Sequence, residues 1–90
     1  MYACMMEYRI EDKHREEYLD WLRQLAETHP QAILYEGTDQ HGLFVEVWPA
    51  STAEEAQRIQ DAARAGAAPW RELTVWTGGK INAWSFRRLT

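Results

Sequence analysis

The sequence has one cysteine, three prolines and five glycines among its 90 residues. A single thiol, Cys4, excludes an internal disulfide and a cysteine-based zinc site. No apolar run is long enough to cross a bilayer, and the first residues carry no basic leader. We therefore expect neither a transmembrane segment nor a signal peptide, and a cytoplasmic location.

Basic residues are outnumbered, with ten Lys and Arg against fourteen Asp and Glu, which gives a net charge of −4. This balance argues against general binding to nucleic acid or to anionic membranes. Hydrophobic residues make up 46% and charged residues 27%, which is typical of a globular protein. The length predicts a single domain over residues 1–90.

Aromatic residues are plentiful: five Trp, four Tyr and two Phe. Each aromatic side chain can bury about 150–250 Å². A domain of this size buries only about 60% of the surface of its unfolded chain. Part of the aromatic surface must then face a partner, a ligand or water, which favours an oligomer or a pocket.

In the first half of the chain, the spacing of apolar residues changes from a period of two to a helical period and then back to a period of two. Tyr2 to Ile10 alternates and predicts a strand whose apolar side holds Tyr2, Cys4, Met6, Tyr8 and Ile10. Lys13 to Thr28 predicts an amphipathic helix with Asp12 as its N-cap. Ala32 to Thr38 and Leu43 to Trp48 alternate across a Gly-containing loop, which predicts a hairpin that ends at Pro49.

The second half predicts two helices and a strand. Two capping-box registers, Ser51 with Glu54 and Thr52 with Glu55, begin a helix that reaches Gly66. Pro69 begins a short helix, Trp70 to Trp76, which Gly78 ends. Lys80 to Leu89 is the last strand. The order β-α-β-β-α-β, with right-handed crossovers, predicts a ferredoxin-like α+β sandwich: a four-stranded antiparallel sheet with both helices on one face.

The uncovered face of this sheet should be polar in a monomer. If Leu43, Val45 and Val47 face the helices, the open face presents Phe44, Glu46 and Trp48. The last strand adds either Trp84 with Phe86 or Ile81 with Ala83. Large aromatics on an exposed face are typical of an interaction surface. We therefore predict a homodimer joined through the open sheet faces; the alternative is that the aromatics lie on the helix side.

The element order, the short Pro-Trp helix and a last strand ending Trp84-Ser85-Phe86-Arg87-Arg88-Leu89 resemble the dimeric α+β-barrel superfamily. Within it, the chain is similar to the antibiotic-biosynthesis monooxygenase-like proteins, which include haem-degrading and quinol monooxygenases. The resemblance implies a dimer that packs two sheets into a barrel, and a substrate cavity between sheet and helices. Haem-degrading members use a strand Asn, a Trp and a helix-borne His. Here residues 56–66 contain no histidine, so we expect no cofactor, with haem as the open alternative.

Aromatic residues are the strongest pocket candidates. We expect the space between sheet and helices to be lined by Tyr8, Trp21, Tyr35, Trp70 and Trp76, with Asn82 as a further polar group. A cofactor-independent oxygenase of this fold binds an electron-rich aromatic in such a chamber, excludes water and stabilises a developing oxyanion. A tyrosine hydroxyl or Asn82 would supply that stabilisation. For each residue the alternative is plain core packing.

Other chemistry-bearing residues favour structural roles. His14, His29 and His41 lack the spacing of metal ligands, so we expect no metal site. Cys4 is expected to be a buried, inert thiol with a raised pKa. Glu7, Glu36 and Glu46 alternate onto strands and are candidates to converge on one sheet face, either for acid–base work or for ion pairs with Arg9, Arg87 and Arg88. Two functions follow: a monooxygenase-like enzyme acting on an aromatic or hydrophobic small molecule, or a non-catalytic dimeric binding or stress-related accessory module.

Overall fold

The computed structural model describes residues 1–90 and follows the predicted element order. The bounds are β1 Tyr2–Arg9, the 3₁₀ turn η1 Asp12–His14, α1 Arg15–Thr28, β2 Ile33–Glu36, β3 Leu43–Ala50, α2 Ala53–Arg64, α3 Arg71–Thr77 and β4 Asn82–Arg87.

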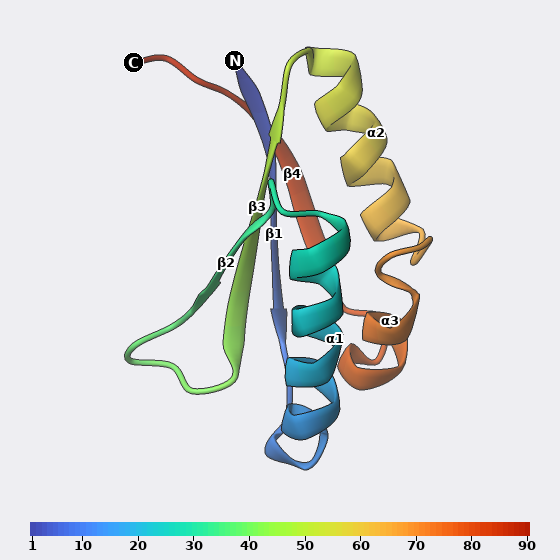
Figure 1. Cartoon of the computed structure of the whole chain (residues 1–90). Coiled ribbons are helices and arrows are strands. Elements are labelled where there is room, and N and C mark those ends of the chain that lie inside the picture. The colour runs from blue at the N-terminus through green and yellow to red at the C-terminus, as the bar shows by residue number, and fades with distance from the viewer.

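The four strands form one antiparallel sheet in the order β2-β3-β1-β4. The helices all lie against the same face of this sheet, which leaves the other face uncovered (Figure 1). The predicted ferredoxin-like α+β sandwich is therefore confirmed. None of the helices is both long and apolar enough to span a membrane.

Local capping explains where the helices begin and end. Thr52 is the N-cap of α2 and its Oγ1 accepts a 3.1 Å hydrogen bond from the Glu55 N–H, so the second of the two predicted capping registers is the one used. Gly78, with φ of 65°, ends α3 in the left-handed region as predicted. Asp12 is not the N-cap of α1: it begins η1, and His14 occupies the cap position without a side-chain bond.

The sequence leaves open which face of β3 turns toward the helices, and the structure decides it. Phe44, Glu46 and Trp48 are buried beneath the helices, whereas Leu43, Val45 and Val47 lie on the open face. The register is the reason, because Phe44 lies opposite Tyr8 and Glu46 opposite Met6. Residues directly opposite in an antiparallel pair share a face, so the inward face of β1 determines that of β3.

Pro49 does not end β3, which continues to Ala50 with Pro49 opposite Ala3. The neighbouring strand β2 pairs only with residues 44–47 of β3. At Pro49 the side of β3 toward β2 is thus a free edge, where a missing N–H removes no ladder hydrogen bond.

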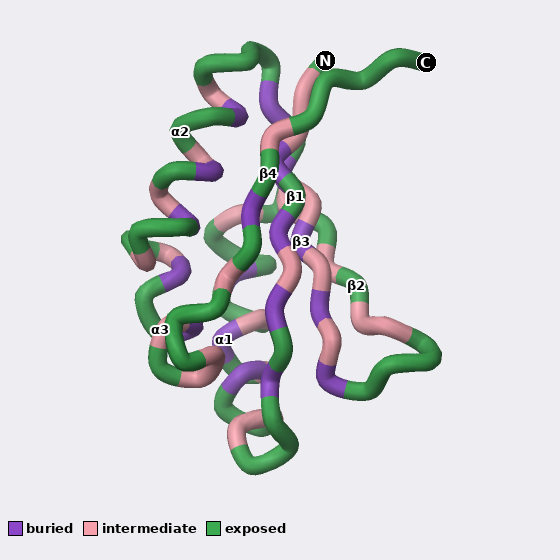
Figure 2. The backbone as a smooth tube through the Cα atoms, turned by 180° about the vertical axis from the view of Figure 1, so that it is seen from behind, coloured by how far each residue is buried: buried purple, intermediate pink, exposed green.

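The core lies between the sheet and the helices, where buried and exposed positions alternate along the strands (Figure 2). Its members come from β1, β3, β4 and all three α-helices: Cys4, Met6, Tyr8, Ile10, Tyr18, Trp21, Leu25, Phe44, Trp48, Ala63, Trp70, Leu73 and Ala83.

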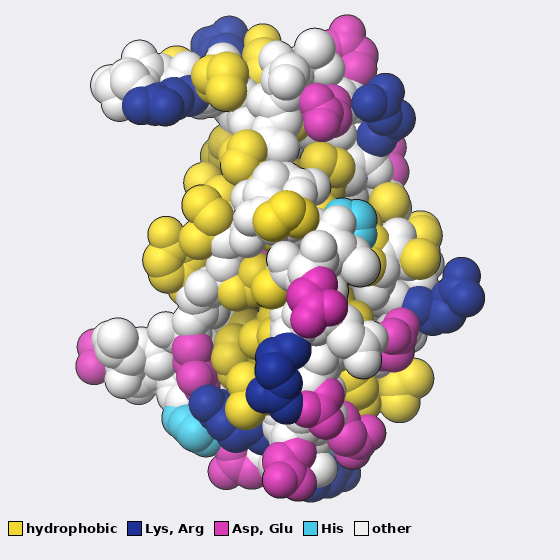
Figure 3. Space-filling model, in the orientation of Figure 1, with side chains coloured by type: hydrophobic (Ala, Val, Ile, Leu, Met, Phe, Trp, Pro, Cys, Tyr) yellow, Lys and Arg dark blue, Asp and Glu magenta, His cyan; other side chains and the backbone are white.

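The open face is apolar over most of its area. One row crosses all four strands, since Met5 lies opposite both Val47 and Trp84, and Val47 lies opposite Ile33. In this row Ile33 is 46% and Trp84 45% exposed. Phe86, opposite Ala3, extends the apolar surface. Hydrophobic side chains accordingly gather on the side away from the helices, at the left of Figure 3.

Candidate functional site

A buried carboxylate, that of Glu46, is the most unusual group in the interior. Its residue is 0% exposed, and its two oxygens accept hydrogen bonds from three aromatic side chains. Oε1 accepts the indole N–H groups of Trp48 at 2.8 Å and Trp70 at 3.0 Å. Oε2 accepts the Tyr8 hydroxyl at 2.5 Å. The carboxyl group of Glu46 thus accepts three hydrogen bonds and donates none. This arrangement is complementary to the ionised form of the acid.

The hydrogen bonds continue from Tyr8 to α1. The hydroxyl oxygens of Tyr8 and Tyr18 are 2.8 Å apart. Because the Tyr8 O–H donates to Glu46, the Tyr18 O–H is the one that donates to Tyr8. The result is a chain of polar atoms, Tyr18 to Tyr8 to Glu46, inside an otherwise apolar core. We call Tyr8, Tyr18, Glu46, Trp48 and Trp70 the buried acid cluster.

Aromatic rings enclose this cluster. The Trp48 and Trp70 rings meet edge to face with centroids 5.1 Å apart. Trp21 stacks on Tyr18 at 5.8 Å, and Trp76 meets Tyr18 edge-on at 6.4 Å. These geometries are the preferred ones for aromatic pairs, so the rings both fill the space and exclude water from the carboxylate.

Burial changes the acidity of the cluster in one direction. Desolvation raises the pKa of Glu46, and the three hydrogen bonds that favour the carboxylate oppose that rise only in part. Burial also raises the pKa of Tyr8 and of Tyr18, and the nearby Glu46 carboxylate adds to the effect. The two phenols therefore keep their protons as donors, while Glu46 is the acceptor of the group.

The structure brings together four of the six predicted pocket residues. Tyr8, Trp21, Trp70 and Trp76 lie between sheet and helices. Tyr35 does not: it is 58% exposed and lies opposite Val45 on the open face. Asn82 is also exposed there, opposite Glu7. The expectation that these last two line the interior is therefore corrected, and each fails because its strand places alternate residues on opposite faces.

Tyr18, Glu46 and Trp48 were not among the predicted pocket residues. A signal for Glu46 was present, because it is the one charged residue in the otherwise apolar alternation Phe44, Glu46, Trp48, Ala50. Paired with the apolar face of β1, that alternation places the acid inside the core.

The three glutamates considered for acid–base work do not converge. Glu46 is buried on the helix side, Glu7 lies on the open face, and Glu36 bonds to α1 at the end of β2. None of the ion pairs of the structure includes Glu46, Arg87 or Arg88.

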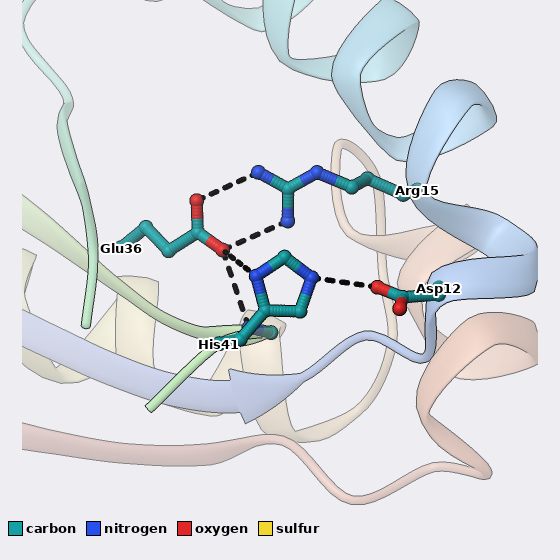
Figure 4. A network of polar contacts seen from close by, with 5 residues as sticks. Asp12, Arg15, Glu36 and His41 are labelled. Atoms are coloured by element: carbon teal, nitrogen blue, oxygen red, sulfur yellow. Dashed lines mark hydrogen bonds and ion pairs between the residues drawn. The ribbon is translucent and has the colours of Figure 1, made fainter. Parts of the chain in front are cut away.

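A separate polar network joins the β2–β3 loop to the start of α1 (Figure 4). The Arg15 guanidinium donates to both Glu36 oxygens at 2.8 Å, and the Gly42 N–H donates to Oε2 at 3.2 Å. His41 lies between Glu36 and Asp12, with its Nε2 2.7 Å from Asp12 Oδ1. These bonds lower the pKa of Glu36 to about 2, with the Arg15 hydrogen bonds as the main cause. The network fastens the loop rather than forming a site.

The residues do not fit the haem site that the resemblance leaves open. Residues 53–64 of α2 contain no histidine. His14 and His41 lie near the start of α1 and His29 caps its end, against Trp48. No group of three or more His, Cys, Asp or Glu side chains is arranged to hold a metal ion. Cys4 is buried, which raises the pKa of its thiol to about 11, as expected for an inert side chain.

Two surface hollows reach tryptophans that pack on the buried acid cluster. Trp21 lines a hollow of about 210 Å³ between α1 and Pro69, and Trp76 lines one of about 400 Å³ beside the end of β1. Both indoles pack on Tyr18. They therefore separate these two hollows from the chain of polar atoms that leads to Glu46.

Comparison with known proteins supports the fold. No protein-family model and no curated protein matches the chain. A solved structure of an antibiotic biosynthesis monooxygenase superposes with a TM-score of 0.75 at 15% identity, over 100% of both chains. Candidate antibiotic biosynthesis monooxygenases from Deinococcus radiodurans and Nitrosomonas europaea give TM-scores of 0.74 and 0.69, at 12% and 15% identity. Each match covers 100% of this chain, and 94% and 100% of the other. The resemblance seen in the sequence is thus confirmed as a likeness of fold.

Removing the Glu46 carboxylate should strongly destabilise the protein. Glu46→Ala leaves three buried donors without a partner, and we expect a loss of about 3 kcal/mol or more. Glu46→Gln keeps one oxygen for the two indoles and should cost about 1–2 kcal/mol. Urea unfolding measures both, with Glu27→Ala on the exposed face of α1 as the control. Equal losses for the Ala and Gln variants would contradict the assigned hydrogen bonds.

The Glu36 network predicts a defined pH dependence. The pKa of Glu36 is about 2 when folded, against an ordinary value of 4.5. A lowered pKa stabilises the fold above the unfolded value, and that stabilisation is lost as the pH falls from about 4.5 toward 2. We expect Glu36→Gln to be less stable than the wild type at neutral pH, with the difference shrinking on acidification. Urea titrations across this range test it, and a constant difference would refute it. Glu27→Gln is the control.

Proposed function

We propose that the protein is a homodimer that acts on an aromatic or hydrophobic small molecule, with the chemistry of a cofactor-independent monooxygenase. The observation that carries this proposal is the Glu46 carboxylate, which is buried among aromatic donors without any cation. A core that needed only stability would gain little from such a group, because a buried acid is costly to desolvate. The likeness of fold to antibiotic biosynthesis monooxygenases supports the assignment.

The open sheet face supports the dimer. Its central row, Ile33, Val47, Met5 and Trp84, has no charged member. An apolar surface that continues across four strands is unfavourable in water, and two copies related by a two-fold axis would bury it against itself.

A charge placed on this row should separate the subunits. Trp84→Glu adds a carboxylate to the edge strand β4, where Trp84 is 45% exposed and the protomer can tolerate it. The mass is measured by size-exclusion chromatography with light scattering. We expect the wild type to have twice the mass of one chain, which is 10.6 kDa, and the variant to have the mass of a single chain.

Val75→Glu is the matched control for this experiment, because Val75 is 75% exposed but belongs to α3 on the other side of the molecule. That variant should stay dimeric. A wild-type protein that is monomeric at micromolar concentration would refute the dimer.

The proposed reaction uses the cluster as an acid–base and oxyanion-binding group. The substrate is an electron-rich aromatic with an activated methylene, and its oxidation by dioxygen gives a ketone and water: CH₂ plus O₂ becomes C=O plus H₂O. Glu46 is the base that accepts the substrate proton, since a carboxylate with a raised pKa is suited to that step. The Tyr18 hydroxyl is the donor to the developing oxyanion.

Access to this group requires an aromatic ring to move. Trp21 and Trp76 stand between the two surface hollows and Tyr18. An aromatic substrate that replaces one of these indoles would keep the ring contacts and bring its reacting carbon toward the tyrosines. The substrate would then lie between sheet and helices, where the resemblance implies a cavity.

The alternative, a non-catalytic dimeric binding or stress-related accessory module, is favoured by the close packing of the same region. Tyr8, Tyr18 and Glu46 are each at most 2% exposed. In this alternative the tryptophans stay in place, and the ligand occupies a surface hollow.

Oxygen consumption distinguishes the two functions. With an anthrone or a quinol as substrate, an oxygenase should consume dioxygen and form the ketone or quinone, and Glu46→Gln should slow this by about 100-fold or more. Glu27→Gln, the same substitution at an exposed helix position, should leave the rate unchanged. Binding of these compounds without turnover would favour the module, and neither binding nor turnover would refute the proposal. A parallel incubation with haem, followed by its absorption spectrum, tests the remaining alternative.

A further inference from the structure

We propose that Tyr8 and Glu46 form a proton-coupled redox pair, which Tyr18, Trp21 and Trp76 connect to the surface of the protein. Oxidation of this pair requires an oxidant. The natural source of that oxidant is the one part of the proposal that rests on the proposed function, because an oxygenase generates partly reduced oxygen species. The pair itself follows from the contacts of the buried acid cluster.

The proton acceptor is already in place. A phenol loses an electron most readily when its proton can move at the same time to a nearby base. The Tyr8 hydroxyl is 2.5 Å from Glu46 Oε2, and both residues are buried. Trp48 and Trp70 donate to the other oxygen, Oε1, so they hold the carboxylate in position and leave Oε2 free for the Tyr8 proton.

The oxidised form of Tyr8 also has a hydrogen-bond donor beside it. A neutral phenoxyl radical keeps an oxygen that accepts hydrogen bonds, and the Tyr18 hydroxyl lies 2.8 Å from it as donor. Since the proton stays on Glu46, beside the oxygen that released it, it can return when the radical is reduced. Burial of both groups keeps that proton from exchanging with water.

The electron has a short route outward through side chains that can themselves be oxidised. Ring centroids are 5.8 Å apart for Tyr8 and Tyr18, 5.8 Å for Tyr18 and Trp21, and 6.4 Å for Tyr18 and Trp76. The two tryptophans line surface hollows, where an oxidant can approach. Each step is therefore between neighbouring rings, and none has to cross the apolar core in one transfer.

The balanced step has an organic peroxyl radical as oxidant. The peroxyl radical gains one electron through the tryptophans and one proton from water, which gives a hydroperoxide. Tyr8 loses the electron, and its hydroxyl proton moves to Glu46. The products are the Tyr8 phenoxyl radical, a neutral Glu46 carboxylic acid and the hydroperoxide. A cellular thiol reverses the change: it supplies one electron and becomes a thiyl radical, and its own proton neutralises the hydroxide that water left in the first step. The Glu46 proton then returns to Tyr8.

The test isolates the buried tyrosines. The sequence has four tyrosines, and Tyr2→Phe with Tyr35→Phe leaves only Tyr8 and Tyr18. This double variant is oxidised by flash-generated tris(bipyridine)ruthenium(III), frozen rapidly and examined by electron paramagnetic resonance. We expect a tyrosyl radical signal in the double variant and its loss when Tyr8→Phe is added. Adding Glu46→Gln should lower the radical yield by about tenfold or more, because the base is gone. Adding Glu27→Gln should not change it.

Two results would overturn the proposal: no tyrosyl signal in the double variant, or an equal yield with Glu46→Gln. Circular dichroism confirms that each variant is folded. If Glu46→Gln does not fold, acidification of the double variant is the second measurement. Protonation of Glu46 should then lower the radical yield, and a yield that does not depend on pH would count against the pair. The experiment uses no organic substrate, so a protein without oxygenase activity can still pass it.

Discussion

The structure depends on how the Glu46 carboxylate is accommodated inside the core. An ionised acid away from water needs donors for both oxygens, and here three elements supply them: Tyr8 from β1, Trp48 from β3 and Trp70 at the start of α3. Sheet and helix are thereby joined by directional bonds deep inside a core whose members are mostly apolar. From composition alone, the high aromatic content indicated a partner or a pocket. The need for hydrogen-bond donors to Glu46 explains part of that content.

More of the fold than of the candidate site could be predicted from the sequence. The element order and the amphipathic face of α1 followed from periodicity, because a period of two and a period of 3.6 differ clearly over eight or more residues. The inward face of β3 did not, since Leu43, Val45 and Val47 are as apolar as Phe44 and Trp48. That choice is made by the pairing of Met6 with Glu46, a contact 40 positions apart that no local pattern encodes.

The candidate site depended on the same long-range choice. Tyr8, Trp21, Trp70 and Trp76 were placed between sheet and helices because each lies on an apolar stripe or beside a helix start. Tyr35 and Asn82 were misplaced because alternation within a strand does not say which set of residues faces the helices. The pairings of Tyr35 with Val45 and of Asn82 with Glu7 put both on the open face. The alternation of β3 alone allows Glu46 on either face, and only the register with β1 places it inside the core.

Cys4 gives this architecture a practical use. It is the only thiol of the chain, lies on the central strand β1 opposite both Trp48 and Ser85, and is fully shielded. A thiol reagent can reach it only when the sheet and its covering helices part. The rate of alkylation of the native protein therefore reports how often its innermost layer opens. A second cysteine placed on the surface can carry a label while Cys4 stays in place.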